Sequence, residues 1–316
     1  MSKINNKILL AVLLVLLFIF LGKRFFGGSG ERNFRDTLVA VDTAQVNKIV
    51  IYPRAAAEGD DINFTKTGTG WEVARAAVKD EANISSVKGM LGNMINMKPK
   101  RLVAKSSDKW AQYEVNDSLG TRVQAFANDE LVADFVLGKF NFQQASRSMS
   151  NFVRLTEDEE VYSVDGFLSS SFNQEFNNFR DRTFVSLTPE NITSVRFEYP
   201  ADSAFALNKI ESKWQIDGVQ ADSAAVSSYL SGLRNMTKSE FADDFAPEGK
   251  SVAYQLAISG DNMQSITVSA YLEADKYILH STLNEGAFFD EGSLQIFDKL
   301  FVNKESLFPK DDQSEE

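Results

Sequence analysis

The hydrophobic and polar positions of the chain predict a set of short strands followed by a helix, and this set occurs twice. Each copy opens with an apolar run that ends at a proline, continues with an alternating run, and then has a Trp-x-Val or Trp-x-Ile triplet. Alternation with a period of two predicts strands with one buried face, and a proline ends a strand because it cannot donate to the ladder. These segments are residues 49–53, 62–66 and 71–73 in the first copy and residues 195–200, 205–209 and 214–216 in the second.

A helix with one apolar face is predicted after the tryptophan strand of each copy. Its apolar residues recur at helical spacing, and Asn83 in the first copy and Asp222 in the second stand at the N-cap position. Asn and Asp side chains accept hydrogen bonds from the free N–H groups of a first helical turn. The apolar residues are Ile84, Val87, Leu91 and Met94 in the first helix and Val226, Tyr229, Leu230 and Leu233 in the second.

Three further strands and a closing amphipathic helix are predicted in each copy. The aromatic anchors, the helix phase and the strand order of the two copies agree with one another, which is the signature of an internal repeat. The predicted fold class is therefore α+β, with two tandem β-rich repeats, each a mostly antiparallel sheet with one main helix, after an N-terminal transmembrane helix. The matched strands are residues 121–127 with 252–258, residues 131–137 with 265–271, and residues 151–155 with 277–281.

The main difference between the copies is an insertion at residues 139–148, where the second copy has only residues 272–276. We predict that the insertion is a loop, and exposed aromatic and arginine side chains on loops are frequent points of partner contact. The alternative is a loop that folds back and buries its own aromatic rings. The candidate interaction residues are Phe140, Phe142, Gln143, Gln144 and Arg147.

An unbroken apolar run from Ile8 to Leu21 follows Lys3 and Lys7. With its flanking residues the run reaches the roughly 30 Å of a bilayer core, since a helix rises about 1.5 Å per residue. No small-residue cleavage site clearly follows it, and the Gly/Ser-rich residues 27–30 resemble a flexible leash. These features favour an uncleaved anchor over the alternative, a cleaved signal peptide. The predicted location is the inner (cytoplasmic) membrane, single-pass, with the C-terminal portion in the periplasm.

The chain is predicted to have four parts. They are residues 1–30 (cytoplasmic stub, anchor and leash), 31–180 (first repeat), 181–308 (second repeat) and 309–316 (acidic disordered tail). Near the junction of the repeats, four phenylalanines recur near helical spacing and are predicted to be core residues: Phe167, Phe172, Phe176 and Phe179. The Arg-Asp-Arg triplet at residues 180–182 is predicted to clamp this junction through charge-assisted hydrogen bonds.

Composition and motifs narrow the function classes. The net charge of −11 disfavours nucleic acid, and the absence of cysteine removes disulfides, thiolate metal sites and thiol nucleophiles. The single histidine, His280, lies in an alternating strand with no Gly-x-Ser-x-Gly elbow in the chain, so a structural role is favoured over a catalytic one. The acidic residues 157–160 lack calcium-loop spacing and are interpreted as a solvated turn. No Gly-x-Gly-x-x-Gly or Walker-type loop is present. We therefore predict no enzymatic activity, cofactor or metal.

Several of these stretches resemble DUF4340, a family of uncharacterised bacterial membrane-anchored envelope proteins. The resemblance covers most of the chain from about Asp42 onward. It implies an extracytoplasmic protein, associated in some members with ABC transporters of the gliding-motility type, and it implies no known activity. The matching stretches are residues 71–73, 136–139, 152–154, 161–164, 179–182 and 221–222.

The sequence as a whole predicts a non-enzymatic, membrane-anchored extracytoplasmic accessory or interaction protein. Its expected partners are the membrane, through the N-terminal helix, and an ABC transporter or other envelope complex, with no nucleic acid. The alternative is a cell-wall or carbohydrate-binding module with carboxylate-based hydrolysis, which needs an aromatic platform beside a cleft. Trp110, Tyr113 and Phe142 are the candidates for that platform.

Overall fold

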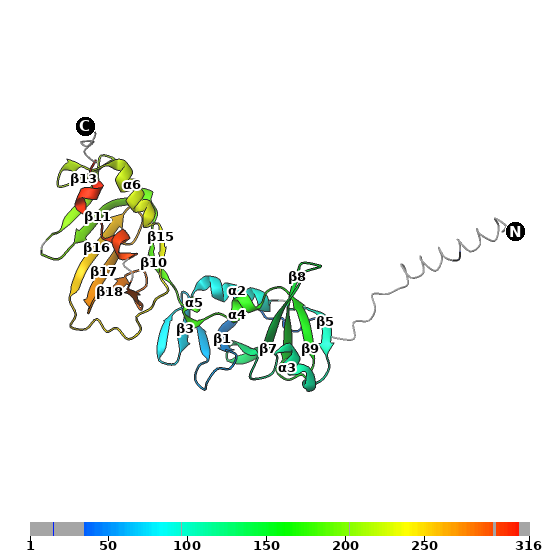
Figure 1. Cartoon of the computed structure of the whole chain (residues 1–316). Helices are drawn as coiled ribbons and strands as arrows, with labels where there is room; N and C mark the ends of the chain where they lie inside the picture. Colours follow the sequence, from blue (N-terminus) through cyan, green and yellow to red (C-terminus); the bar gives the residue numbers. More distant parts are fainter. Residues whose placement is uncertain (1–14, 16–34, 96, 202, 293–294, 310–316) are drawn as a thin grey trace, which may run out of the picture.

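The computed structural model describes residues 15, 35–95, 97–201, 203–292 and 295–309 (Figure 1). Apart from Val15, the predicted anchor and leash at residues 1–30 lie outside these residues, as does almost all of the predicted tail at residues 309–316. Within the described residues, no helix is long and apolar enough to cross a membrane. The architecture that they form is mostly antiparallel β-sheet with few helices.

The first unit is built on a nine-stranded antiparallel sheet with the order β4-β3-β2-β1-β6-β7-β8-β9-β5. Its strands are β1 (Val46–Tyr52), β2 (Ile62–Lys66), β3 (Trp71–Arg75), β4 (Val78–Glu81), β5 (Pro99–Ala104), β6 (Thr121–Ala127), β7 (Glu130–Gln143), β8 (Ser148–Leu155) and β9 (Val161–Asp165). Its helices are α2 (Ile84–Met94), η1 (Ser107–Lys109), α3 (Trp110–Tyr113), α4 (Ser169–Phe172) and α5 (Phe176–Phe179). Figure 1 shows α2 and α4 together on one side of the sheet and α3 on the other.

The second unit has an eight-stranded antiparallel sheet, β14-β13-β12-β11-β16-β17-β18-β19, and a two-stranded sheet, β10-β15. Its strands are β10 (Thr183–Ser186), β11 (Ile192–Glu198), β12 (Phe205–Ile210), β13 (Lys213–Ile216), β14 (Val219–Gln220), β15 (Asn235–Thr237), β16 (Val252–Gly260), β17 (Ile266–Glu273), β18 (Lys276–Ser281) and β19 (Phe288–Glu291). Its helices are η2 (Pro189–Asn191), α6 (Ser223–Gly232), α7 (Phe297–Leu300) and η3 (Lys304–Leu307).

The two large sheets share one strand order. Eight strands of the first sheet have a counterpart in the second sheet with a number higher by ten, such as β14 for β4, β11 for β1 and β19 for β9. The counterparts stand in the same order. The main helix follows β4 in the first unit and β14 in the second, and it starts at the predicted N-cap. The side-chain oxygen of Asn83 accepts hydrogen bonds from the N–H groups of Ser85 and Ser86, and Asp222 accepts from Ala224 and Ala225. These caps satisfy N–H groups that a first helical turn otherwise leaves free.

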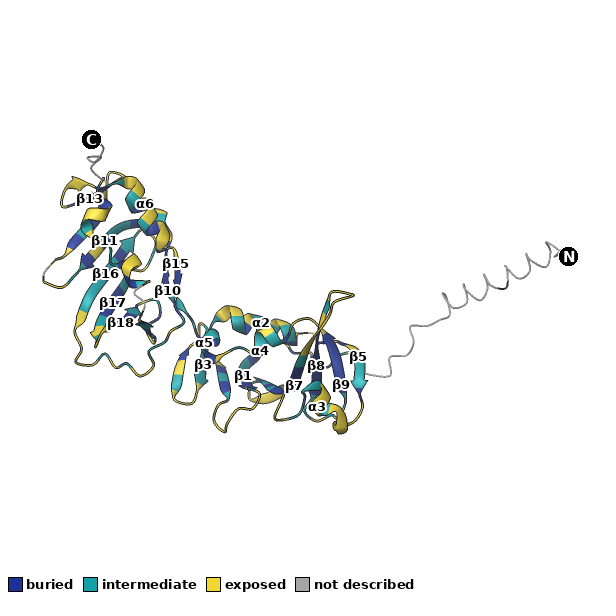
Figure 2. Ribbon diagram, viewed as in Figure 1, coloured by how far each residue is buried: buried dark blue, intermediate teal, exposed yellow. Residues whose placement is uncertain are grey.

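Each unit has its own buried core between its sheet and its main helix. The first contains Ile49, Phe64 and Phe135, and the second contains Phe197, Leu207 and Phe289, among other residues (Figure 2). In α2 the buried side chains are Val87, Met90 and Met94. The prediction that Ile84 lies on the buried face is wrong, because this residue is in the first turn, beyond the sheet, and lines an open cleft.

The closing helices differ from their prediction. In the first unit the chain makes two one-turn helices, α4 and α5, and in the second unit it makes the one-turn helix α7. Phe172, Phe176 and Phe179 are buried as predicted, whereas Phe167 is exposed. The reason is positional, since Phe167 precedes α4 and packs on Phe140 outside the main core, with ring centroids 4.6 Å apart.

Candidate functional site

The predicted interaction loop at residues 139–148 is not a loop. Strand β7 continues to Gln143 and β8 starts at Ser148, so most of the segment is a β-hairpin that projects from the sheet (Figure 1). Phe140 pairs with Asn151 and Phe142 with Met149, after a register shift that follows Leu137. Alternating aromatic and polar residues favour paired strands, and the turn residues 144–147 connect them.

Three large apolar side chains on the hairpin are not covered by the core, and Phe167, from the segment before α4, packs beside Phe140. Directly opposed residues of paired strands point to the same face, so Phe142 and Met149 lie side by side, and Phe140 shares their face. The exposed fractions are 37% for Phe140, 53% for Phe142, 47% for Met149 and 49% for Phe167. We call these four residues the hairpin face. The alternative of buried aromatic rings is wrong, and Gln143, Gln144 and Arg147 are exposed at the tip.

The candidate carbohydrate platform is not assembled. Trp110 stacks on the guanidinium of Arg154 at 3.8 Å and donates its Nε1–H to the carbonyl of Glu159 at 2.9 Å. Tyr113 packs on Phe152 with a centroid distance of 4.6 Å. Both belong to a small third cluster that covers part of the first sheet, whereas Phe142 lies on the hairpin. Trp110 and Tyr113 therefore lie on a different surface from Phe142, and the three rings do not form one platform.

The other residues considered for chemistry have structural contacts. His280 lies in β18, stacks on Phe288, and has Nε2 at 3.2 Å from the carbonyl oxygen of Glu285. In the acidic turn, Asp158 pairs with Arg35 at 2.9 Å and Glu160 accepts a hydrogen bond from the hydroxyl of Tyr162. Among the side chains that the structure describes, no group of three or more His, Asp or Glu residues could hold a metal ion.

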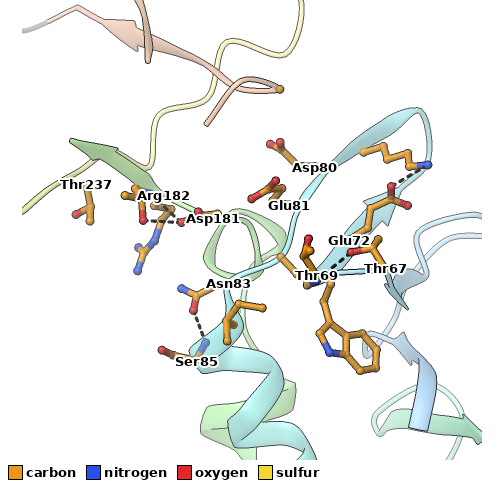
Figure 3. A pocket seen from close by; sticks show the side chains of 17 residues that line it. Thr67, Thr69, Glu72, Asp80, Glu81, Asn83, Ser85, Asp181, Arg182 and Thr237 are labelled. Atoms are coloured by element: carbon orange, nitrogen blue, oxygen red, sulfur yellow. Dashed lines mark hydrogen bonds and ion pairs between the residues drawn. The ribbon is translucent and has the colours of Figure 1, made fainter. Parts of the chain in front are cut away.

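A polar cleft of about 860 Å³ lies between the two units (Figure 3). Edge strand β4 and the first turn of α2 supply one wall, including Asp80, Glu81 and Ser85. The junction and the second unit supply the other wall, with Arg182 and Thr237. The cleft therefore exists only when both units hold their relative positions.

A buried arginine beside the cleft joins the units. Arg180 donates to Asp80 Oδ2 from Nε at 2.9 Å and from a terminal nitrogen at 2.7 Å, and it pairs with Asp243 of the second unit at 2.6 and 3.0 Å. Its guanidinium also lies 3.4 Å from the ring centroid of Phe241. Burial raises the pKa of Asp80, an effect that the hydrogen bond and charge of Arg180 only partly oppose. The predicted junction clamp is thus an ion-pair network with one partner in each unit.

Backbone contacts reinforce this junction. The N–H of Asp181 donates to the carbonyl of Glu81, and the N–H of Asn83 donates to the carbonyl of Phe179, both at 2.7 Å. A Cβ on Gly286 would lie only 3.2 Å from Asp80 Oδ1, so glycine lets this loop of the second unit approach the ion pair closely.

Sequence reasoning missed the partners of Arg180. Asp80 occupies a strand in which a buried position is expected to be apolar, and that mismatch is the one signal the sequence offers. It also missed a second buried pair just beyond the junction, Lys238 and Glu291, whose charged atoms lie 2.5 Å apart. Nothing in the spacing of these residues indicates their pairing.

Comparison with known proteins gives one positive result. The family model described as a domain of unknown function, DUF4340, matches residues 75–257, more than half of the chain. No curated protein and no solved structure matches the chain significantly. The matched region runs from β3 of the first unit into β16 of the second and includes the hairpin, the junction and both main helices.

Proposed function

The chain belongs to the DUF4340 family, and from this premise we propose that it is a non-enzymatic accessory or interaction protein of the cell envelope. In this proposal residues 1–30 anchor it in the inner membrane and hold the two units in the periplasm. Its partner is an envelope complex such as an ABC transporter, the association that the resemblance to this family implies.

The hairpin face is the observation that carries this proposal. Three large apolar side chains on an arm outside both cores, with Phe167 packed beside them, contribute little to the stability of either unit while they remain in water. Exposed apolar groups gathered on one surface are typical of sites that contact another molecule. The hairpin therefore supports a protein that works by contact.

The junction supports the same proposal in a second way. Because Arg180 is paired with carboxylates of both units, the units are held in one relative orientation, and the cleft between them keeps its shape. An accessory protein needs such a fixed geometry to present two surfaces to one complex.

The carbohydrate-binding alternative has less support. Aromatic side chains that bind sugars lie open beside a cleft, but Trp110 and Tyr113 are occupied by Arg154 and Phe152. The cleft between the units has Trp71 as its sole aromatic wall residue among the described residues that line it.

A pull-down from native membranes tests the proposed function. The tagged full-length chain is purified in mild detergent, beside a chain that lacks residues 1–30. We expect stoichiometric recovery of envelope proteins with the full-length chain and loss of membrane association for the shortened one. Recovery of the full-length protein without any bound envelope protein would refute the accessory role.

A further inference from the structure

The hairpin face lies mostly on an arm that projects from the first unit. It stands at the end of two strands that extend past the edge of the sheet, and Figure 2 shows the arm exposed along most of its length. Ile95, at the end of α2, adds another exposed apolar side chain. The neighbouring helices are joined by a hydrogen bond of 2.9 Å from Asn93 of α2 to Ser171 of α4.

The charged residues around the hairpin face are mostly basic, whereas the net charge of the whole chain is negative. Residues 95–107 and 138–153 contain no acidic residue, although the chain has 44 Asp and Glu against 33 Lys and Arg. The basic residues of these two segments are Lys98, Lys100, Arg101, Lys105, Lys139 and Arg147. Near the base of the hairpin these segments therefore carry positive charge, apart from Asp165 of β9, which lies between them, whereas Lys105 lies at the far end of β5.

Sheet pairing brings the two basic segments together. Strand β9 lies between the hairpin strand β8 and edge strand β5, so β5 and β8 are about 10 Å apart. Asp165 of β9 pairs with Ser150 at the base of the hairpin, and Lys100 of β5 reaches the Asp165 carboxylate at 2.9 Å. We call β5 and the preceding Lys98 the basic edge.

We propose that the hairpin face and the basic edge dock the first unit on the anionic surface of the bilayer. The apolar side chains enter the boundary between headgroups and acyl chains, and the lysines and arginines contact lipid phosphates. This inference rests on the proposed membrane tether. It assigns the hairpin face to contact with lipid, so the envelope complex of the proposed function contacts other surfaces of the two units.

Three observations favour lipid over a protein partner at this surface. Protruding aromatic and methionine side chains suit a fluid interface, whereas a protein partner needs a complementary pocket. The surrounding charge is positive in an otherwise acidic chain, which matches anionic headgroups. The apolar run that ends at Leu21 is close in the chain, since the eight residues between Phe26 and Arg35 span up to about 30 Å.

The test uses the full chain in lipid vesicles and exploits the absence of cysteine. A single cysteine at the hairpin tip, Gln144→Cys, carries an environment-sensitive fluorophore. The matched control is Asp275→Cys in the tight turn of the β17–β18 hairpin of the second unit. Vesicles contain phosphatidylcholine with or without phosphatidylglycerol, and lipid-attached quenchers report contact with acyl chains.

We expect the label at residue 144, but not the label at residue 275, to be quenched, and more strongly with phosphatidylglycerol. Phe142→Ser with Met149→Ser should abolish the quenching. Lys98→Glu with Lys100→Glu should lower the ratio of docked to undocked molecules by about tenfold or more. Unchanged thermal unfolding of these variants would show that the fold is retained.

The outcomes separate this inference from the proposed function. If the chain floats with vesicles while the label at residue 144 stays in water, lipid docking is refuted and the tether stands. If the chain does not float, the tether fails, and an unquenched label refutes docking as well. A label that responds only when envelope proteins are added, independently of lipid charge, refutes lipid docking in favour of a protein partner.

Discussion

The two units share a strand order but differ in the segment that follows the main helix. In the first unit, residue Met97 forms a bridge with Val39, and the chain then continues as β5 along the edge of its own sheet. In the second unit, β15 pairs with β10, and the chain returns to its sheet through one bridge, Phe241 to Phe289. The segment that follows the main helix therefore pairs with the large sheet as a six-residue strand in the first unit and through a single bridge in the second.

Inward positions are alike in both units, whereas outward positions differ. The pairing registers place Phe64 and Leu207 at equivalent buried sites. By the same registers, the outward-facing Asp134 corresponds to Thr267, and Arg154 to His280. The first unit uses these charges to hold extra structure, since Arg154 donates to carbonyls of Val115 and of the turn after β8. Core packing therefore preserves the scaffold, and the outer face is free to diverge.

The hairpins show the same divergence. Strand β7 has 14 residues and, with β8, forms the arm that carries three residues of the hairpin face, whereas its counterpart β17 has 8 and turns tightly. The proposed contact surface belongs to the first unit, and the second unit contributes one wall of the cleft. The expected effects below test this division, starting with the residue on which both units depend.

Replacing Arg180 should have the largest effect because this residue is shared. Arg180→Met leaves Asp80 buried without its counter-charge, which should lower the free energy of unfolding by about 3–5 kcal/mol. Urea denaturation measures the loss. The matched control is Arg182→Met, which removes hydrogen bonds to Asn178 and Ser239 and should cost about 1 kcal/mol. Adding Asp80→Asn to Arg180→Met should recover part of the stability, and a lack of recovery would contradict the buried-charge explanation.

Equivalent core substitutions should show whether the units unfold separately. Phe64→Ala should cost about 3–5 kcal/mol and Leu207→Ala about 2–5 kcal/mol, because each leaves a cavity in a fully buried position. Hydrogen exchange should accelerate only in the sheet that contains the substitution. Equal acceleration in both sheets would mean that the junction makes the two units one cooperative unit.

The helix caps provide a smaller, matched pair. Asn83→Ala and Asp222→Ala should each cost about 1 kcal/mol, because each removes a side-chain acceptor for two N–H groups. Thermal unfolding measures both, with Ser228→Ala on the exposed face of α6 as the neutral control. An unchanged transition for Asn83→Ala would contradict a stabilising role of this cap.

The smallest expected effect is on the pH dependence of stability, which should differ between the outer faces of the two sheets. Burial raises the pKa of Asp134, but hydrogen bonds from Arg122, Thr156 and Gln124 outweigh it and place the pKa below the ordinary 3.8. A lowered carboxyl pKa stabilises the fold above the unfolded value, and this contribution disappears as the pH falls through the folded value. Asp134→Asn should cost about 1 kcal/mol or less near pH 7 and nothing at the lowest pH. A pH-independent cost would exclude the charge as its cause, and Thr267→Val in the second unit is the control.

Much of the fold could be predicted because its signals are local. The predicted strands at residues 121–127 and 277–281 appear within one or two residues of β6 and β18, and both N-caps lie where predicted. Strands β4, β5, β10, β14, β15 and β19 were missed, since basic strands and strands of two to four residues carry no clear alternation. The insertion was mistaken for a loop because the second copy has no counterpart to it, although pairing with β8 makes residues 140–143 strand residues.

The candidate site was predictable in part. The sequence located the aromatic insertion and the Arg-Asp-Arg junction, because both interrupt an otherwise repeated pattern. It did not locate Asp80 or Asp243 as the partners of Arg180, which lie 100 and 63 residues away. Such distant pairs are fixed by the packing of the two units, and no spacing rule encodes them.

The sequence by itself determined the repeat, the strand alternation, the helix caps and the composition that disfavours many classes of chemistry. These follow from local preferences and from the periodicity of side chains along the backbone. The tertiary structure decided where β5 and β15 pair, that the insertion stands out as an arm, and that basic residues from separate segments surround it. Those features depend on which strands become neighbours, and that choice is made by burial and hydrogen bonding across the whole sheet.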